Sequence, residues 1–158
     1  MKPSLTWLAL AMVAAGPAAA QQATPADAPA LLRGGFAEVS DWVTRAADLV
    51  PAEQYGYRPV GTVRTFAQLV GHVADSYNYY CGRGAGRNVE WADPAEKGSQ
   101  DKAVLLRQLK QATDACTAAY AAENGQMPPL LGNVAHTSLH YGNMVTYLRM
   151  LGLVPPSS

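Results

Sequence analysis

The sequence predicts an all-α protein, a four-helix bundle with a long crossover connection. Apolar residues recur at spacings of three and four in four separate segments, which is the period of an amphipathic helix. No segment shows the strict apolar–polar alternation of a strand, and the connections between helical segments are long enough to allow a crossover. The chain has 158 residues, of which 49% are hydrophobic, so its length suits one domain with a sizeable core.

The charge balance limits the partners to expect. The chain has 12 Lys and Arg residues, 12 Asp and Glu residues and a formal net charge of zero. A neutral chain gives no electrostatic reason to expect nucleic acid or an anionic membrane as partner. We therefore expect an unidentified small-molecule substrate, and a function that depends on a few residues.

The N-terminal residues have the pattern of a secretory signal. Lys2 precedes an apolar run over residues 5–15, and the small residues of Ala18–Ala20 suit a signal peptidase. Cleavage there would leave no membrane anchor and would place the protein in the periplasm or outside the cell; the alternative is an uncleaved anchor. The predicted organisation is a signal peptide over residues 1–20, a flexible lead-in over 21–29 and the bundle over 30–158.

The first two helices have clear stop or start signals. The first runs from about residue 30 to Val50, because Pro51 cannot continue it. Thr65 with Gln68 three residues later forms a capping box that begins the second helix, and the glycines from Gly82 onward end it.

The third and fourth helices follow the same logic. Ser99 or Asp101 caps the third helix, and Asn124-Gly125 is a C-terminal stop. After Pro128-Pro129 we expect Asn133 to cap the fourth helix, which then runs to Leu151.

The loop between the first and second helices carries Tyr55, Tyr57, Arg58 and Arg64. If the site opens toward this end, the two arginines meet an anionic substrate. The interpretation we favour is plainer: these are exposed loop residues whose Tyr rings cap the bundle.

Several chemistries are excluded by missing motifs. The glycines of residues 82–86 follow a helix and precede no Lys-Ser/Thr, so they do not form a phosphate loop. The sequence has no C-x-x-C-H for haem attachment and no G-x-S-x-G elbow of a serine hydrolase. None of its histidines has a Glu three residues before it, as the di-iron bundles require.

The three histidines are the strongest functional signal. His136 and His140 lie four residues apart on one face of the fourth helix, which is the spacing of a chelating pair. His72 lies at the edge of the buried stripe of the second helix. Three imidazoles can hold zinc, nickel or iron(II) and leave one position open. The alternative is that the histidines merely pack.

The two cysteines are predicted to form a disulfide. Export implies an oxidising compartment, where a pair outside any C-x-x-C motif favours a bridge over a redox or metal site. Cys81 and Cys116 both fall on inward-facing helical positions.

Two stretches carry a resemblance to a known family. The segments Arg64–Val73 and Asn133–Asn143, followed by Tyr147-Leu148-Arg149, resemble the DinB-like family of four-helix metalloproteins over essentially the whole mature chain. In that family a second-helix histidine and an H-x-x-x-H pair on the fourth helix bind a divalent metal. The matching positions are His72, His136 and His140.

The resemblance also implies a range of activities. Characterised relatives include thiol transferases and isomerases that use bacillithiol or mycothiol, and members often dimerise through helix faces. Export departs from that pattern because a cytosolic thiol is not the obvious co-substrate. Asn143 stands where many relatives have Gln.

These observations lead to one main hypothesis. The chain is predicted to be a metal-dependent enzyme, thiol-transferase-like or a hydrolase, in which Asn143 and Tyr147 orient the open metal position. No acidic residue is an obvious general base; Asp75, one turn beyond His72, is the nearest candidate, but we expect it to be a solvated surface residue. The alternatives are a non-catalytic metal or small-molecule binder and a purely structural bundle.

Overall fold

The computed structural model describes residues 28–158, and this part of the chain is an all-α bundle, as predicted. The predicted signal peptide, residues 1–20, lies outside the described residues, as does most of the lead-in. The helices are α1 (Ala28–Leu49), α2 (Phe66–Gly84), α3 (Lys102–Ala121) and α4 (Met127–Met150), with a short 3-10 helix, η2 (Ala52–Gln54), after α1. Among these residues, no helix is both long and apolar enough to cross a membrane.

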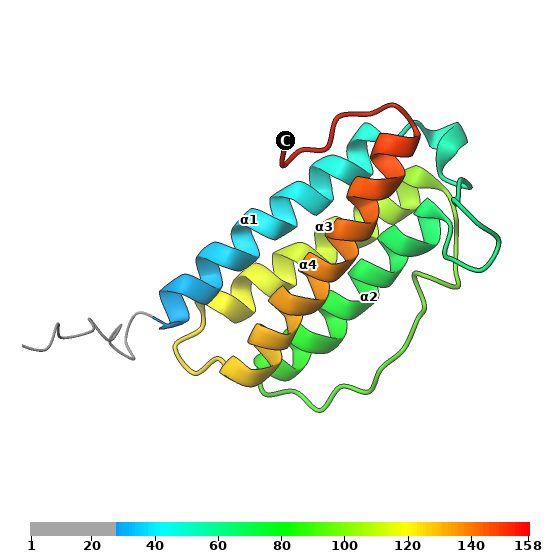
Figure 1. Cartoon of the computed structure of the whole chain (residues 1–158). Coiled ribbons are helices and arrows are strands. Elements are labelled where there is room, and N and C mark those ends of the chain that lie inside the picture. Colours follow the sequence, from blue (N-terminus) through cyan, green and yellow to red (C-terminus); the bar gives the residue numbers. More distant parts are fainter. Residues whose placement is uncertain (1–27) are drawn as a thin grey trace, which may run out of the picture.

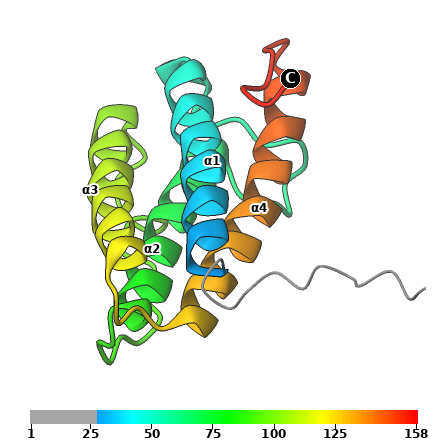
Figure 2. The same ribbon diagram turned by 90° about the vertical axis from the view of Figure 1, so that its left-hand side faces the viewer.

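The four helices run side by side, and α1 and α2 each pack against both α3 and α4 (Figures 1 and 2). The segment of residues 85–101, hereafter the crossover segment, returns along the outside of α2, so α3 runs in the same direction as α2 (Figure 1). This is the long crossover that the sequence predicted. Helices α2 and α4 run in opposite directions (Figure 1).

The predicted caps of α2 and α3 are present. The backbone N–H of Gln68 donates to Thr65 Oγ1 at 3.1 Å, and the Gln68 side chain accepts from the Thr65 N–H at 2.9 Å. Asp101 accepts from the backbone N–H of Val104 at 2.9 Å at the start of α3. Each cap satisfies backbone donors that the first helical turn leaves unpaired.

The predicted start of α4 is wrong. The helix begins at Met127 rather than at Asn133, because Pro128 and Pro129 lie in its first turn, where a missing N–H costs no hydrogen bond. Asn133 is instead fully buried inside the helix, and its side-chain nitrogen donates to the Tyr120 hydroxyl at 3.2 Å.

The predicted disulfide joins α2 to α3. Cys81 and Cys116 form the bridge, with Cα atoms 5.0 Å apart and both residues buried in the core. Nearby, the rings of Phe36 and Tyr120 stack with centroids 4.4 Å apart, which ties α1 to the same end of the bundle. A buried disulfide is typical of proteins from oxidising compartments.

Candidate metal centre

The three predicted histidines meet between α2 and α4. The Nε2 atom of His140 lies 3.1 Å from Nε2 of His72 and 3.3 Å from Nε2 of His136. His72 and His140 are buried and His136 is half-buried. We call these three residues the histidine cluster.

The geometry of the histidine cluster suits a divalent ion. Two imidazole nitrogens bound to one tetrahedral ion at about 2.0–2.1 Å lie roughly 3.3 Å from each other. Burial is the largest cause that lowers the pKa of both His136 and His140 to about 4. Charge on the neighbouring histidines and on Arg64 acts in the same direction. Both rings are therefore neutral at pH 7, which is the form that binds metals. This group can hold a metal ion.

A carboxylate fixes the orientation of His72. The Nδ1 atom of His72 lies 2.7 Å from Oε2 of Glu96, so Nδ1–H donates to the carboxylate and the Nε2 lone pair faces the cluster. Arg64 donates to the other Glu96 oxygen at 2.7 Å. Burial would raise the pKa of Glu96, but the hydrogen bonds from Arg64 and His72 outweigh it and lower the pKa. Metal-binding histidines are commonly oriented by such a carboxylate.

Asp75 is buried, so the prediction of a solvated surface residue is wrong. It is 2% exposed, and its carboxylate accepts the backbone N–H groups of Ala95 at 3.1 Å and Glu96 at 2.9 Å. Burial raises its pKa, although these two backbone bonds act in the opposite direction. Asp75 thus anchors the crossover segment where Glu96 reaches His72.

A glycine allows this close approach. A Cβ atom at Gly71 would lie 2.7 Å from the backbone of Ala95, so any larger residue would push the crossover segment away from α2. Sequence reasoning missed Glu96 because it lies in an irregular segment 24 residues after His72. The available signal was Gly71 with Asp75, a small and a polar residue one turn apart on a buried helix.

Aromatic rings cover the outer side of the histidine cluster. The Trp91 ring lies 5.5 Å from that of His72, and the Tyr80 ring lies 5.4 Å from that of His136. The Trp91 indole N–H donates to Asp93 at 2.6 Å, and Lys97 pairs with the same carboxylate at 3.0 Å. Asp93 also lies close enough to His72 and Glu96 to form a second possible ligand group, but its two oxygens are already engaged.

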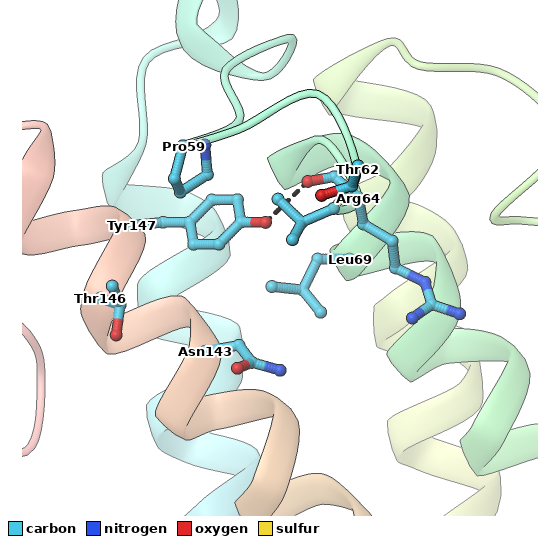
Figure 3. Close-up of a pocket in the computed structure, with 8 residues that line it drawn as sticks. Pro59, Thr62, Arg64, Leu69, Asn143, Thr146 and Tyr147 are labelled. Atoms are coloured by element: carbon cyan, nitrogen blue, oxygen red, sulfur yellow. Dashed lines mark hydrogen bonds between the residues drawn. The ribbon is translucent and has the colours of Figure 1, made fainter.

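Of the two predicted orienting residues, Tyr147 has another partner. Its hydroxyl donates to the backbone oxygen of Arg64 at 2.7 Å, while Asn143 is exposed (Figure 3). Both line a pocket of about 550 Å³, and no histidine is among the residues that line it. Neither side chain forms a hydrogen bond with a nitrogen of the histidine cluster.

The loop before α2 follows the prediction only in part. Tyr55 is buried and donates to the Ala47 carbonyl at 2.7 Å, with its ring 5.4 Å from that of Phe66, so it caps the bundle. Arg58 is exposed and contacts the Gly61 carbonyl at 3.4 Å. Arg64 is also exposed at the surface, yet it is tied to the site through Glu96.

Comparison with known families agrees with this geometry. The family model of the DinB superfamily matches residues 36–147, which is more than half of the chain and includes the whole histidine cluster. The chain belongs to the DinB superfamily. Comparison with curated proteins and with solved structures gives no match. The contacts from Arg64 to Glu96 and from Glu96 to His72 are observed in the structure and do not depend on the family assignment.

Proposed function

We propose that this DinB superfamily protein is an exported, metal-dependent enzyme, a transferase or a hydrolase. His72, His136 and His140 would hold one zinc, nickel or iron(II) ion. The observation that carries the proposal is the convergence of three Nε2 atoms, with neighbouring distances of 3.1 and 3.3 Å, in mostly buried rings, of which those of His136 and His140 are neutral.

Residues around the histidine cluster orient its rings and set their charge state. A divalent ion with three protein ligands keeps a position free, and it makes a bound water or thiol more acidic. Glu96 holds the Nδ1 proton of His72, and Arg64 keeps Glu96 ionised. The rings of Trp91 and Tyr80 lie against those of His72 and His136.

Export is part of the proposal. It is supported by the pattern of a charged residue, an apolar run and small residues within positions 1–20. The buried Cys81–Cys116 disulfide gives independent support, since such bridges persist in oxidising compartments. In the periplasm or outside the cell, the substrate would be a small molecule other than an abundant cytosolic thiol.

One observation favours the second candidate, a non-catalytic metal binder. The two carboxylates nearest the cluster already have partners: Glu96 accepts from Arg64 and His72, and Asp75 accepts from two backbone amides. Neither is free to act as a general base without breaking these contacts. A binder needs no such base.

Metal analysis of three single variants tests the site. The mature protein, purified without a His tag, should contain one divalent ion per chain. His72→Ala, His136→Ala and His140→Ala should each weaken binding by more than about a hundredfold, because two imidazoles rarely hold such an ion. Ser138→Ala, an exposed change on the same helix, should leave binding unchanged.

The outcomes separate the candidates. Full metal occupancy in all three histidine variants would show that the site is assigned wrongly. If the ion binds, a screen of thiol-transfer and hydrolysis substrates decides between enzyme and binder. Turnover that requires the metal and is lost in His136→Ala supports the enzyme, whereas binding without turnover of any substrate supports the binder.

A further inference from the structure

We infer that a pocket between α2, α3 and the crossover segment binds a small organic ammonium ion, with the ammonium group at Asp75 and Gln108. The pocket is separate from the histidine cluster, since no histidine of the described chain lines it, and the inference goes beyond the proposed function. Its volume is about 260 Å³, below the roughly 300–1,000 Å³ of sites for drug-sized ligands, so it suits a smaller molecule.

The disulfide sets the register that brings the polar side chains of this pocket together. Helices α2 and α3 run in the same direction (Figure 1), and the bridge joins Cys81 to Cys116 with Cα atoms 5.0 Å apart. Asp75 lies six residues before Cys81, which is about 9 Å along α2. Gln108 and Gln111 lie eight and five residues before Cys116, which is about 12 and 7.5 Å along α3. The level of Asp75 therefore falls between those of the two glutamines, which line the same pocket.

Asp75 and Gln108 present buried acceptors to this pocket. Asp75 is 2% exposed, and its carboxylate accepts the backbone N–H groups of Ala95 and Glu96. Two N–H groups do not occupy the roughly four lone-pair sites of a carboxylate. The side-chain oxygen of Gln108, Oε1, is also buried and has no hydrogen-bond partner within residues 28–158. Two buried acceptors on neighbouring helices favour a ligand that brings several N–H donors.

The charge around Asp75 favours a cation. Burial is the largest cause that raises its pKa; the two backbone hydrogen bonds lower it, and the negative charges of Asp93 and Glu96 raise it further. Among the described residues, no Lys or Arg lines the pocket. A cation bound beside the carboxylate would supply a positive charge and stabilise its ionised form.

The rest of the lining favours an organic cation over a metal ion. Calcium takes roughly six to eight oxygen ligands at once, whereas Asp75 is the only acidic residue of the described chain that lines the pocket. Ala74 and Ala112 line it as well, and their methyl groups suit a short alkyl chain. Asn78 and Gln111 are exposed and lie at the mouth. The pocket thus joins a charged inner end to partly apolar walls.

The test uses n-butylammonium at pH 7 as probe and 1-butanol as its neutral control. Binding is followed by NMR in the protein as purified and after removal of bound metal, and the backbone N–H signals of Ala95 and Glu96 report on Asp75. The ammonium should bind at least tenfold more tightly than the alcohol, because hydrogen bonds from a charged donor are the stronger ones. It should shift both N–H signals, with affinities in the two preparations that agree within about threefold.

Two variants with matched controls locate the binding site. Gln108→Met removes the unpaired acceptor and should weaken binding at least threefold, whereas Gln126→Met, an exposed change outside the pocket, should not. Asp75→Asn should weaken binding at least tenfold, whereas Asp114→Asn, which removes the same charge from an exposed position on α3, should not. If Asp75→Asn releases the crossover segment, Gln108→Met decides alone, since Gln108 Oε1 has no contact to lose.

Other results overturn the inference. Equal binding of ammonium and alcohol, or full affinity in Gln108→Met, would show that the probe does not bind in this pocket. Tetramethylammonium carries the charge without any N–H donor, so equally tight binding of that ion would overturn the role of the two acceptors. Tighter binding of Ca²⁺ or Mg²⁺ that shifts the same signals would make the pocket a metal site. Binding only in the presence of bound metal would place the probe at the histidine cluster instead.

Discussion

Two polar clusters lie inside the same bundle, two helical turns apart on α4, and their hydrogen bonding differs. Asn133 is 0% exposed and His140 is 7% exposed, so both are buried. The Asn133 amide nitrogen contacts the Tyr120 hydroxyl at 3.2 Å and Cys81 Sγ at 3.5 Å. The Tyr120 hydroxyl in turn donates to the Leu130 carbonyl at 2.6 Å. We call Asn133, Tyr120 and Cys81 the asparagine cluster. Within it, Asn133 Oδ1 has no hydrogen-bond partner among the described residues.

In the histidine cluster only His72 has such a partner on its Nδ1 atom, the Glu96 carboxylate. The Nδ1 atoms of His136 and His140 are buried with no hydrogen-bond partner among the described residues. The Nε2 atom of His140 faces those of both His72 and His136, and a single ring nitrogen cannot form two good hydrogen bonds there. Buried polar groups without partners are costly, and these two Nδ1 atoms carry that cost, as Asn133 Oδ1 does in the other cluster. What separates the two clusters is the convergence of the three Nε2 atoms, which could hold a metal ion, whereas the asparagine cluster adjoins the disulfide.

The largest expected effect comes from removing the disulfide. The double change Cys81→Ala and Cys116→Ala should lower the free energy of unfolding by about 4 kcal/mol, because the bridge closes a loop of 35 residues in the unfolded chain. Urea unfolding at 15 °C measures this loss. Metal affinity of the folded fraction, measured at the same temperature, should stay within about threefold of the unaltered protein.

That result would separate the two clusters directly. A stability loss below about 1 kcal/mol would contradict the structural role of the bridge. A collapse of metal affinity while the helices remain formed would show that the two clusters are coupled. Either finding would break the comparison.

The next effect in size concerns the carboxylate behind His72. Glu96→Gln removes the charge that accepts the Nδ1 proton and should weaken metal binding by roughly 10- to 100-fold, as such outer partners usually contribute. Competition with a coloured chelator measures the affinity. Glu90→Gln, an exposed change in the same crossover segment, is the matched control and should have no effect.

A further readout distinguishes orientation of His72 from general damage to the fold. Glu96→Gln should keep the melting temperature within a few degrees, since Glu96 contributes to no apolar packing in the core. Unchanged metal affinity would mean that Glu96 does not orient the ring for binding. A large drop in melting temperature would show that Glu96 mainly stabilises the fold.

The parts of the fold that could be predicted are those that local spacing determines. The capping box of Thr65 and Gln68 and the four-residue step from His136 to His140 each depend on one helical turn, and both are found as expected. The disulfide followed from two inward-facing positions. The start of α4 differs from the prediction because a proline pair fits the first turn of a helix as well as it fits the end of a loop.

The remaining parts depend on the path of the crossover segment. Asp75 has a surface-type side chain on a helix, and only the return of Ala95 and Glu96 over α2 buries it. The same path brings Glu96 to His72 from 24 residues away. Irregular segments carry no periodic pattern, so neither contact could be derived from spacing. Helical spacing therefore could not locate Glu96, and the only signal was the indirect one of Gly71 and Asp75 on a buried helix.

The smallest expected effect is that of metal removal on the fold. The bundle has a continuous apolar core and a disulfide, and the histidine cluster adds no covalent link between elements. Chelation of protein loaded with one equivalent of metal should therefore leave helical circular dichroism at 25 °C unchanged and lower the melting temperature by only a few degrees. Excess metal must be avoided, because any ion that binds the native state raises the melting temperature by mass action. Removal of the ion should abolish whatever metal-dependent activity the substrate screen finds, while reduction of the disulfide in the same protein should destabilise the fold far more. Unfolding by the chelator would make the histidine cluster a structural site and remove the difference between the two clusters.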